Sequence, residues 1–260
     1  MTQRAFAVAA HPDDIEFMMA GTLILLKQAG CEIHVMAVGN GSCGSEQVDA
    51  ATIARMRRQE CIDAAALIGA VWHESLCPDL EIFYNKELLQ RLASVMREVA
   101  PTILLTHPPQ DYMEDHMNTC RLALTAAFAR GMPNFPVLPP RPPIGTPVTV
   151  YHALPYGLRD PLNRHVHPEF FVDISSVLDG KRQMLARHRS QKDWLDASQG
   201  IDSYLNHMET MSREVGHLSR RFELAEGWTR HLPFGYCAEH ANPLVETLAG
   251  LTWQPTSPVY

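Results

Sequence analysis

Histidines and carboxylates occur together in two short polar segments that lie far apart in this chain. In the first segment, residues 11–14, His11 and Asp14 are three positions apart. The second segment begins at His107 and ends at His116, with carboxylates between them. Two imidazoles and one carboxylate with an open coordination position suit a catalytic Zn²⁺ ion, and they also suit Fe(II). The alternative for residues 11–14 is a plain strand-to-helix turn in which an Asp caps the helix.

The elements around these segments are expected to bring them together. Residues 5–10 are apolar and predict a buried strand that ends just before His11. Residues 102–106 predict a second strand just before His107. In a parallel sheet, the loops that follow the strands lie at the same carboxyl-terminal edge. We therefore expect His11, Asp14 and one histidine of the second segment to meet there.

The rest of the chain predicts an α/β fold with a Rossmann-like, mostly parallel sheet and helices on both faces. Expected strands at 5–10, 32–38, 71–76 and 102–106 alternate with expected helices at 16–28, 51–68, 85–99 and 115–129. Residues 133–147 are rich in proline and predict an extended surface crossing. Beyond it, strands are expected at 148–153 and 170–174, and helices at 179–188 and 203–224.

This order of elements suggests a single domain over residues 1–260. Residues 1–130 are expected to form the parallel α/β core with the metal site. Residues 131–260 are expected to add the proline-rich crossing and a smaller C-terminal α+β portion that completes the substrate pocket. A chain of 260 residues with 46% hydrophobic content is large enough for such a core.

Charge and cysteine content narrow the class of protein. The net charge of −7, from 22 basic and 29 acidic residues, argues against nucleic-acid binding. The six cysteines form no CxxC pair, so a thiolate zinc site is not expected. The N-terminus does not resemble a signal peptide, and no apolar stretch is long enough to span a membrane. We expect a cytoplasmic homo-oligomer that binds a small-molecule substrate and neither nucleic acid nor membrane.

The motif Ala-His-Pro-Asp-Asp at residues 10–14, with the later pair Asp115-His116, resembles the PIG-L/LmbE-like zinc-dependent de-N-acetylase family. The resemblance extends over most of the chain, to about residue 240. It implies that His11, Asp14 and His116 are the zinc ligands and that Asp13 is the general base. Such a metal lowers the pKa of a bound water towards ~7, and a neighbouring carboxylate can then take the proton.

Three weaker motifs resemble substrate-pocket segments of the same family. They are Arg57 in Arg-x-x-Glu, Asp79 in Pro-Asp, and His188 in a segment similar to His-x-Ser-Gln. The resemblance implies that these side chains bind substrate. The alternatives are a structural ion pair for Arg57 and Asp79, and a packing role at a helix end for His188.

The activity implied by the resemblance is metal-dependent hydrolysis of an N-acyl group on a small polar, amino-sugar-containing substrate. One position departs from the family pattern, because Met113 stands where a second histidine usually assists the oxyanion. Methionine cannot donate a hydrogen bond. A branch of the family hydrates unsaturated carboxylic acids, so a zinc-dependent hydratase or lyase is the alternative. A non-catalytic metal-binding protein is the third class.

Overall fold

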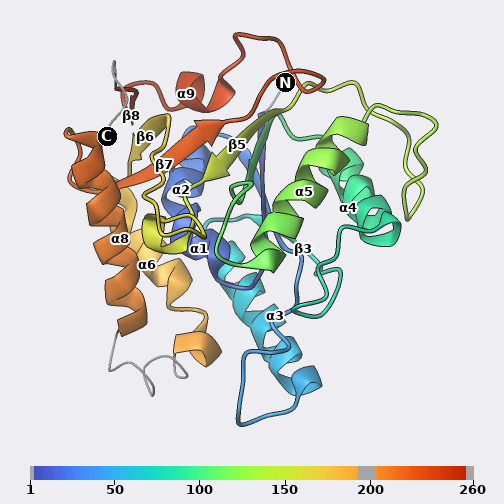
Figure 1. The fold of residues 1–260 in the computed structure, drawn as a ribbon, viewed down its shortest axis with the longest axis horizontal. Coiled ribbons are helices and arrows are strands. Elements are labelled where there is room, and N and C mark those ends of the chain that lie inside the picture. The colour runs from blue at the N-terminus through green and yellow to red at the C-terminus, as the bar shows by residue number, and fades with distance from the viewer. Residues whose placement is uncertain (1–2, 193–202, 256–260) are drawn as a thin grey trace.

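A computed structural model of the chain describes residues 3–192 and 203–255. In these two ranges the centre is an eight-stranded sheet in the order β3-β2-β1-β4-β5-β7-β6-β8 (Figure 1). The strands are β1 (Arg4–Ala9), β2 (Glu32–Ala37), β3 (Val71–His73), β4 (Ile103–Thr106), β5 (Thr149–Ala153), β6 (Phe170–Asp173), β7 (Ala225–Arg230) and β8 (Thr252–Trp253).

The five strands from β3 to β5 run parallel, and the remainder of the sheet is antiparallel. Each of the neighbouring pairs β3–β2, β2–β1, β1–β4 and β4–β5 is parallel. β7 then pairs antiparallel with both β5 and β6, and β8 pairs antiparallel with β6. The predicted α/β architecture with a mostly parallel sheet is therefore confirmed.

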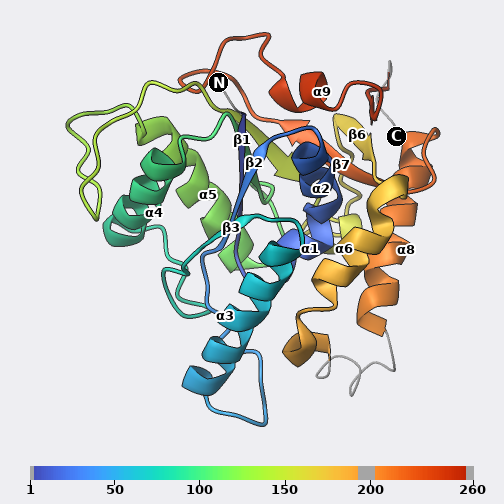
Figure 2. The ribbon, with the colours of Figure 1, turned by 180° about the vertical axis from the view of Figure 1, so that it is seen from behind.

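Helices cover both faces of the sheet (Figures 1 and 2). Because side chains alternate along a strand, Ala5, Ala7 and Ala9 of β1 pack into one hydrophobic cluster and Phe6 and Val8 into another. The first cluster includes side chains of α1 (Asp14–Met18), α2 (Ala20–Gln28), α3 (Ala50–Leu67) and α6 (Leu178–Leu185). The second includes side chains of α4 (Lys86–Val99) and α5 (Glu114–Ala129).

The C-terminal part adds a third hydrophobic cluster against the antiparallel strands. It is formed largely by α8 (Ser203–Ser219), which packs along β7 and β6. The short α9 (Pro243–Thr247) follows β7. Strands from both predicted portions of the chain thus share one sheet, and the domain boundary near residue 130 stays a prediction. Within the described ranges, no helix combines the length and apolar character needed to cross a membrane.

The helix predicted at residues 16–28 is in fact two helices, separated at Met19. The backbone N–H groups of Gly21 and Thr22 at the start of α2 each donate to the Glu226 carboxylate at 2.8 Å. Glu226 is buried on β7 and forms an ion pair of 2.7 Å with the buried Lys181. A carboxylate from a distant strand therefore satisfies the free N–H groups of a helix start in the middle of the predicted helix.

Two strands, β7 and β8, were not predicted. β7 contains Glu226 and Gly227 and lacks the apolar run of a typical strand, and β8 has only two residues. Gly227 is required because a Cβ there would lie 2.7 Å from a Leu154 side-chain atom. Helices predicted at 179–188 and 203–224 end earlier, at Leu185 and Ser219. Residues 133–147 contain neither helix nor strand, as expected for the proline-rich crossing.

Candidate active site

The order of the strands places both polar segments at one crevice. From β1 the chain passes to β2 and β3, and it then returns to place β4 on the other side of β1. The connections that follow β1 and β4 therefore diverge, and such a switch point opens a crevice at the carboxyl edge of the sheet. Residues 10–13 connect β1 to α1, and residues 107–113 connect β4 to α5. The first turns of both helices consequently face the same crevice.

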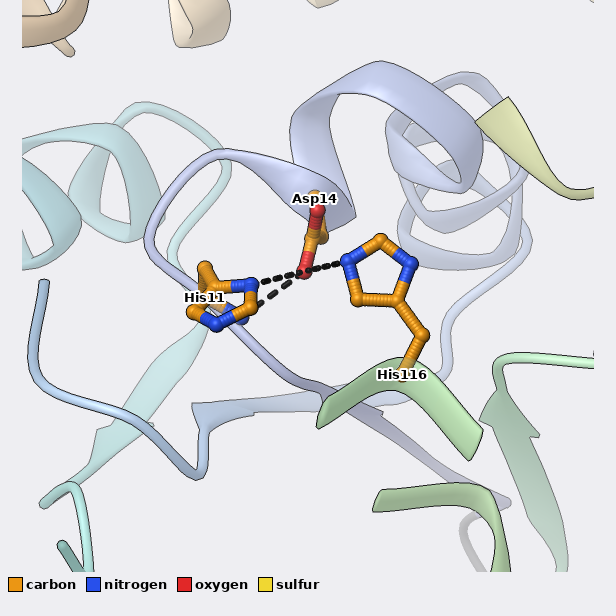
Figure 3. Close-up of side chains that lie close together, drawn as sticks. All are labelled: His11, Asp14 and His116. Carbon is orange, nitrogen blue, oxygen red and sulfur yellow. Dashed lines mark hydrogen bonds and ion pairs between the residues drawn. The ribbon is translucent and has the colours of Figure 1, made fainter. Parts of the chain in front are cut away.

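The structure brings His11, Asp14 and His116 together at this crevice (Figure 3). Oδ2 of Asp14 lies 3.6 Å from Nδ1 of His11 and 3.5 Å from Nε2 of His116. These separations are too long for good N–H···O hydrogen bonds. They match ligands that share one ion, because bonds of roughly 2.0–2.1 Å at tetrahedral angles place ligand atoms roughly 3.3 Å apart. The donor set and its spacing therefore fit a divalent metal.

Each of these imidazoles also contacts a second carboxylate through its other nitrogen. Nδ1 of His116 lies 3.0 Å from Oδ1 of Asp111, and Nε2 of His11 lies 2.9 Å from Oδ2 of Asp115. A carboxylate in this position fixes the ring orientation and the tautomer of a metal-binding histidine. The nitrogens that remain, Nδ1 of His11 and Nε2 of His116, are those beside Asp14.

The electrostatics of the cluster also favour a cation. Burial opposes positive charge on His11, but the hydrogen bond to Asp115 and the nearby Asp14 carboxylate outweigh it and raise the pKa of His11 to about 10. Burial likewise opposes charge on His116, and Asp14 and Asp111 raise its pKa nonetheless. Despite its burial, the pKa of Asp14 is held well below its usual value by the surrounding imidazoles, with His116 foremost. The carboxylates thus make the site suitable for positive charge.

His107 lies beside this cluster but already uses its Nε2 lone pair. The backbone N–H of Ala10 donates to Nε2 of His107 at 2.9 Å, and the ring stacks on His116 with centroids 4.1 Å apart. A second possible metal group consists of His107, Asp111 and His116. In that group the Asp111–His116 contact is a 3.0 Å hydrogen bond. The first cluster, in which the facing atoms lack such bonds to one another, is the better metal site.

Replacing Asp111 by Asn is expected to weaken metal binding about 10–100-fold, because the amide is a poorer acceptor for the His116 Nδ1–H. Asp111 is fully buried, and the nearly isosteric Asn should preserve the packing. Competition with a chelating zinc indicator measures the dissociation constant. The exposed Asp179→Asn variant serves as a control and should bind metal like the wild type. Equal affinity of the Asp111 variant and this control would exclude the orienting role.

Asp13 is a half-buried carboxylate at the same crevice, and it does not cap the following helix. It precedes α1 with a left-handed backbone (φ 104°), and its side chain makes no capping hydrogen bond. Its Oδ2 instead accepts a hydrogen bond of 2.6 Å from the Tyr204 hydroxyl. Burial and the adjacent Asp14 charge raise the pKa of Asp13 to about 6, although His188, Tyr204 and Arg57 oppose this shift. A carboxyl group in this environment is suited to exchange protons near neutral pH.

A cavity of about 350 Å³ opens onto these residues. Arg57 and Asp79 both line it. The Asp79 carboxylate accepts the backbone N–H groups of Gly41 (2.7 Å) and Cys43 (3.1 Å). Asp79 therefore holds the loop that follows β2.

Arg57 crosses the same loop from α3. Its guanidinium donates to the Gly44 carbonyl at 3.1 Å and to the Gln191 side chain. A side chain at position 44 would overlap the guanidinium, so the close approach requires glycine. Among residues 3–192 and 203–255, no carboxylate forms an ion pair with Arg57. The alternative role of Arg57 and Asp79, a structural ion pair, is therefore not seen in these ranges.

His188 lies behind the cavity wall, whereas Met113 faces the cavity. His188 is 1% exposed and does not line the cavity; its Nε2 is 3.2 Å from Oε2 of Glu16. Met113 is the residue that precedes α5, and its side chain lines the cavity. The contacts of His188 correspond to the packing alternative. At Met113 the cavity wall carries a thioether where the family pattern has an imidazole.

Some cavity residues were not found from the sequence, including Tyr156 and Tyr204. They come from the C-terminal part of the chain, where neither spacing nor composition sets them apart from surface or core residues. Tyr204 follows the helical pattern of α8 and is indistinguishable from any core aromatic. Only the packing of α8 against α1 reveals its contact with Asp13.

Comparison with known proteins agrees with this geometry. The family model of the GlcNAc-PI de-N-acetylases (PIG-L) matches residues 6–127. The chain is 26% identical to a diacetylchitobiose deacetylase of Thermococcus kodakarensis, over 73% of this chain and 70% of that protein. It is 29% identical to a 4-oxalmesaconate hydratase of Pseudomonas putida, over 68% of this chain and 69% of that protein.

A solved structure supports the fold over a longer range. The 4-carboxy-2-hydroxymuconate hydratase of Pseudomonas putida superposes with a TM-score of 0.75 and 23% identity, covering 93% of this chain and all of that one. The segment that the family model matches contains the clustered His11, Asp14 and His116, together with Asp13 and the outer carboxylates. Residues 6–127, which contain all of these side chains, are thus similar to the PIG-L family of GlcNAc-PI de-N-acetylases.

Proposed function

We propose that this protein is a zinc-dependent deacetylase, which hydrolyses the N-acetyl group of a small, amino-sugar-containing substrate. The observation that carries the proposal is the placement of His11, Asp14 and His116 around one point, with the Asp13 carboxylate at the same cavity. Three protein ligands with an open position are typical of catalytic rather than structural zinc. The cavity volume of about 350 Å³ suits a small molecule.

The roles of the residues follow from their positions. A zinc ion bound by the three ligands would polarise the amide carbonyl and make a bound water more acidic. Asp13 accepts the proton of the attacking water and returns it to the nitrogen of the leaving amine. Asp111 and Asp115 hold the two imidazoles in the orientation that ligation needs. Arg57 can bind a polar or anionic substituent of the substrate, because no described carboxylate forms an ion pair with it.

Acetate release from a panel of N-acetylated amino sugars, including diacetylchitobiose, tests the proposal. We expect turnover that stops when a chelator removes the metal and returns when zinc is added, whereas return with Fe(II) alone would identify the other candidate metal. An enzyme that binds metal but releases no acetate from any member of the panel would contradict the proposal. The expected homo-oligomeric state stays a prediction.

Hydration of an unsaturated carboxylic acid is the second candidate, and Met113 is the observation that favours it. The cavity has a thioether where a hydrogen-bond donor would assist an amide oxyanion. Arg57, which forms no ion pair with a described carboxylate, is compatible with a carboxylate substrate. Loss of the absorbance of a conjugated substrate, without acetate release, would identify the hydratase.

Replacing Met113 by His distinguishes these two functions. In a deacetylase the new imidazole should add a donor near the carbonyl and raise kcat/KM for acetate release about tenfold, or about 1.4 kcal/mol. In a hydratase it should bring no gain. Met113→Leu, which removes the sulfur without adding a donor, is the matched control and should not increase acetate release. A gain in Met113→Leu equal to that in Met113→His would exclude hydrogen bonding as the cause.

A further inference from the structure

The candidate base Asp13 receives a hydrogen bond from a helix far away in the chain. The hydroxyl of Tyr204, near the start of α8, donates to Oδ2 of Asp13 at 2.6 Å, across 191 residues. Tyr204 lies outside the segment that the family model matches, and it lines the same cavity as Asp13. The C-terminal part thus contributes a direct contact to the chemistry of the N-terminal core.

The Tyr204 ring is held firmly by its surroundings. The residue is only 4% exposed, and its ring lies against Phe17 of α1 with centroids 5.2 Å apart. It belongs to the same hydrophobic cluster as Met208 of α8 and Phe171 of β6. Burial, together with the charge of Asp13, raises the pKa of Tyr204 well above its usual value, so the hydroxyl stays protonated. Tyr204 is therefore a fixed donor rather than a base.

Asp13 needs such a partner because its local backbone does not orient it. Its φ of 104° lies in the left-handed region, and its carboxylate caps no helix N–H. Within residues 3–192 and 203–255, the Tyr204 hydroxyl is the hydrogen-bond donor seen on the Asp13 side chain. A carboxylate that must meet one water proton loses efficiency when it samples several rotamers.

We propose that Tyr204 is a positioning residue for Asp13: it engages Oδ2 and leaves Oδ1 to exchange the proton with water and substrate. This inference rests on the proposed function of Asp13 as general base. The Tyr204 O–H bond stays intact throughout. The proton moves only from the attacking water to Oδ1 of Asp13 and then to the leaving amine. Tyr204 acts by fixing where that transfer occurs.

Replacing Tyr204 by Phe removes the hydroxyl and keeps the ring. We expect kcat to fall roughly 10–100-fold because the base is misplaced, while KM stays within about twofold because substrate contacts remain. Bound metal should equal that of the wild type. Tyr151→Phe is the matched control: its buried hydroxyl donates to Asn242 at 2.7 Å, outside the cavity. This control should lose stability comparably and keep kcat.

A double-mutant cycle tests whether Tyr204 acts through Asp13. In the Asp13→Asn background, which has no base to position, Tyr204→Phe should change the residual rate by less than about twofold. An equal fold-loss in both backgrounds would overturn the proposal, as would an unchanged kcat in the single Tyr204→Phe variant. A rise in KM without a fall in kcat would assign Tyr204 to substrate binding instead.

Crystal structures of the wild type and Tyr204→Phe test the positioning role without any assay of the reaction. We expect one Asp13 conformer in the wild type and more than one in the variant. A wild type without deacetylase activity would reject the proposed function but leave this comparison valid. A single, unmoved Asp13 conformer in Tyr204→Phe would reject the positioning role even in an active deacetylase.

Discussion

Replacing Asp13 by Asn is expected to lower kcat for acetate release about 10²–10⁴-fold, the usual contribution of a general acid–base group. The amide has nearly the shape of the carboxylate, but it cannot take a proton from water. The Asn side chain can still accept the Tyr204 hydroxyl bond, so the local packing should survive. Steady-state kinetics with metal analysis of the same preparation makes the measurement.

The control for this variant is Asp63→Asn, which changes an exposed carboxylate on α3 outside the cavity. It should retain both metal and kcat. Full metal content with unchanged kcat in Asp13→Asn would remove Asp13 from the mechanism. Loss of metal in Asp13→Asn would instead show that Asp13 supports the metal site, because the lost activity would then have a different cause.

Replacing His116 by Ala is expected to remove the bound metal and, with it, essentially all turnover. Wild-type protein should hold about one divalent metal per chain after mild purification, and the variant should hold less than about one tenth of that after dialysis. Added zinc should raise the unfolding temperature of the wild type, because a ligand that binds only the folded state stabilises it. The variant should show no such shift. Elemental analysis and thermal unfolding measure these two effects.

His116 belongs to both possible metal groups, so a second pair of variants decides between them. His11→Ala should lose metal like His116→Ala, whereas His107→Ala should retain it because Nε2 of His107 binds the Ala10 N–H. The reverse pattern would move the metal to the group of His107, Asp111 and His116. His165→Ala, an exposed histidine outside the cavity, controls for the loss of any imidazole.

The relatives include a deacetylase and a hydratase, so the side chains of this cavity must decide between the two reactions. Proteins with deacetylase and hydratase names match the chain over similar lengths. The cluster of His11, Asp14 and His116 does not separate these reactions, because a metal ion bound there would be a suitable Lewis acid for either. The side chains that can separate them face the substrate, with Met113 and Arg57 the clearest examples. For this reason the Met113→His variant tests the substrate class more directly than variants of the metal cluster do.

The local sequence determined the parallel core and the two polar loops that contain His11, Asp14 and His116. Apolar runs such as residues 5–10 and 102–106 have few alternatives to buried strands, and polar loops that follow parallel strands must meet at one edge. His11, Asp14 and His116 could therefore be named from spacing and family resemblance. Each of these three residues lies within a few positions of the strand or helix that places it. The local sequence pattern was therefore sufficient to predict where they lie.

Tertiary packing decided the features that depend on contacts between distant segments. The break at Met19 arises because Glu226, more than 200 positions away, accepts the N–H groups that start α2. Tyr204 reaches Asp13 because α8 packs beside α1. His188, which was predicted to bind substrate, instead lies 3.2 Å from Glu16. No local pattern encodes such contacts, because each depends on where the whole sheet places helices that are far apart in sequence. The cluster of His11, Asp14 and His116 could thus be predicted from the chain, whereas the orientation of Asp13 and the shape of the cavity required the fold.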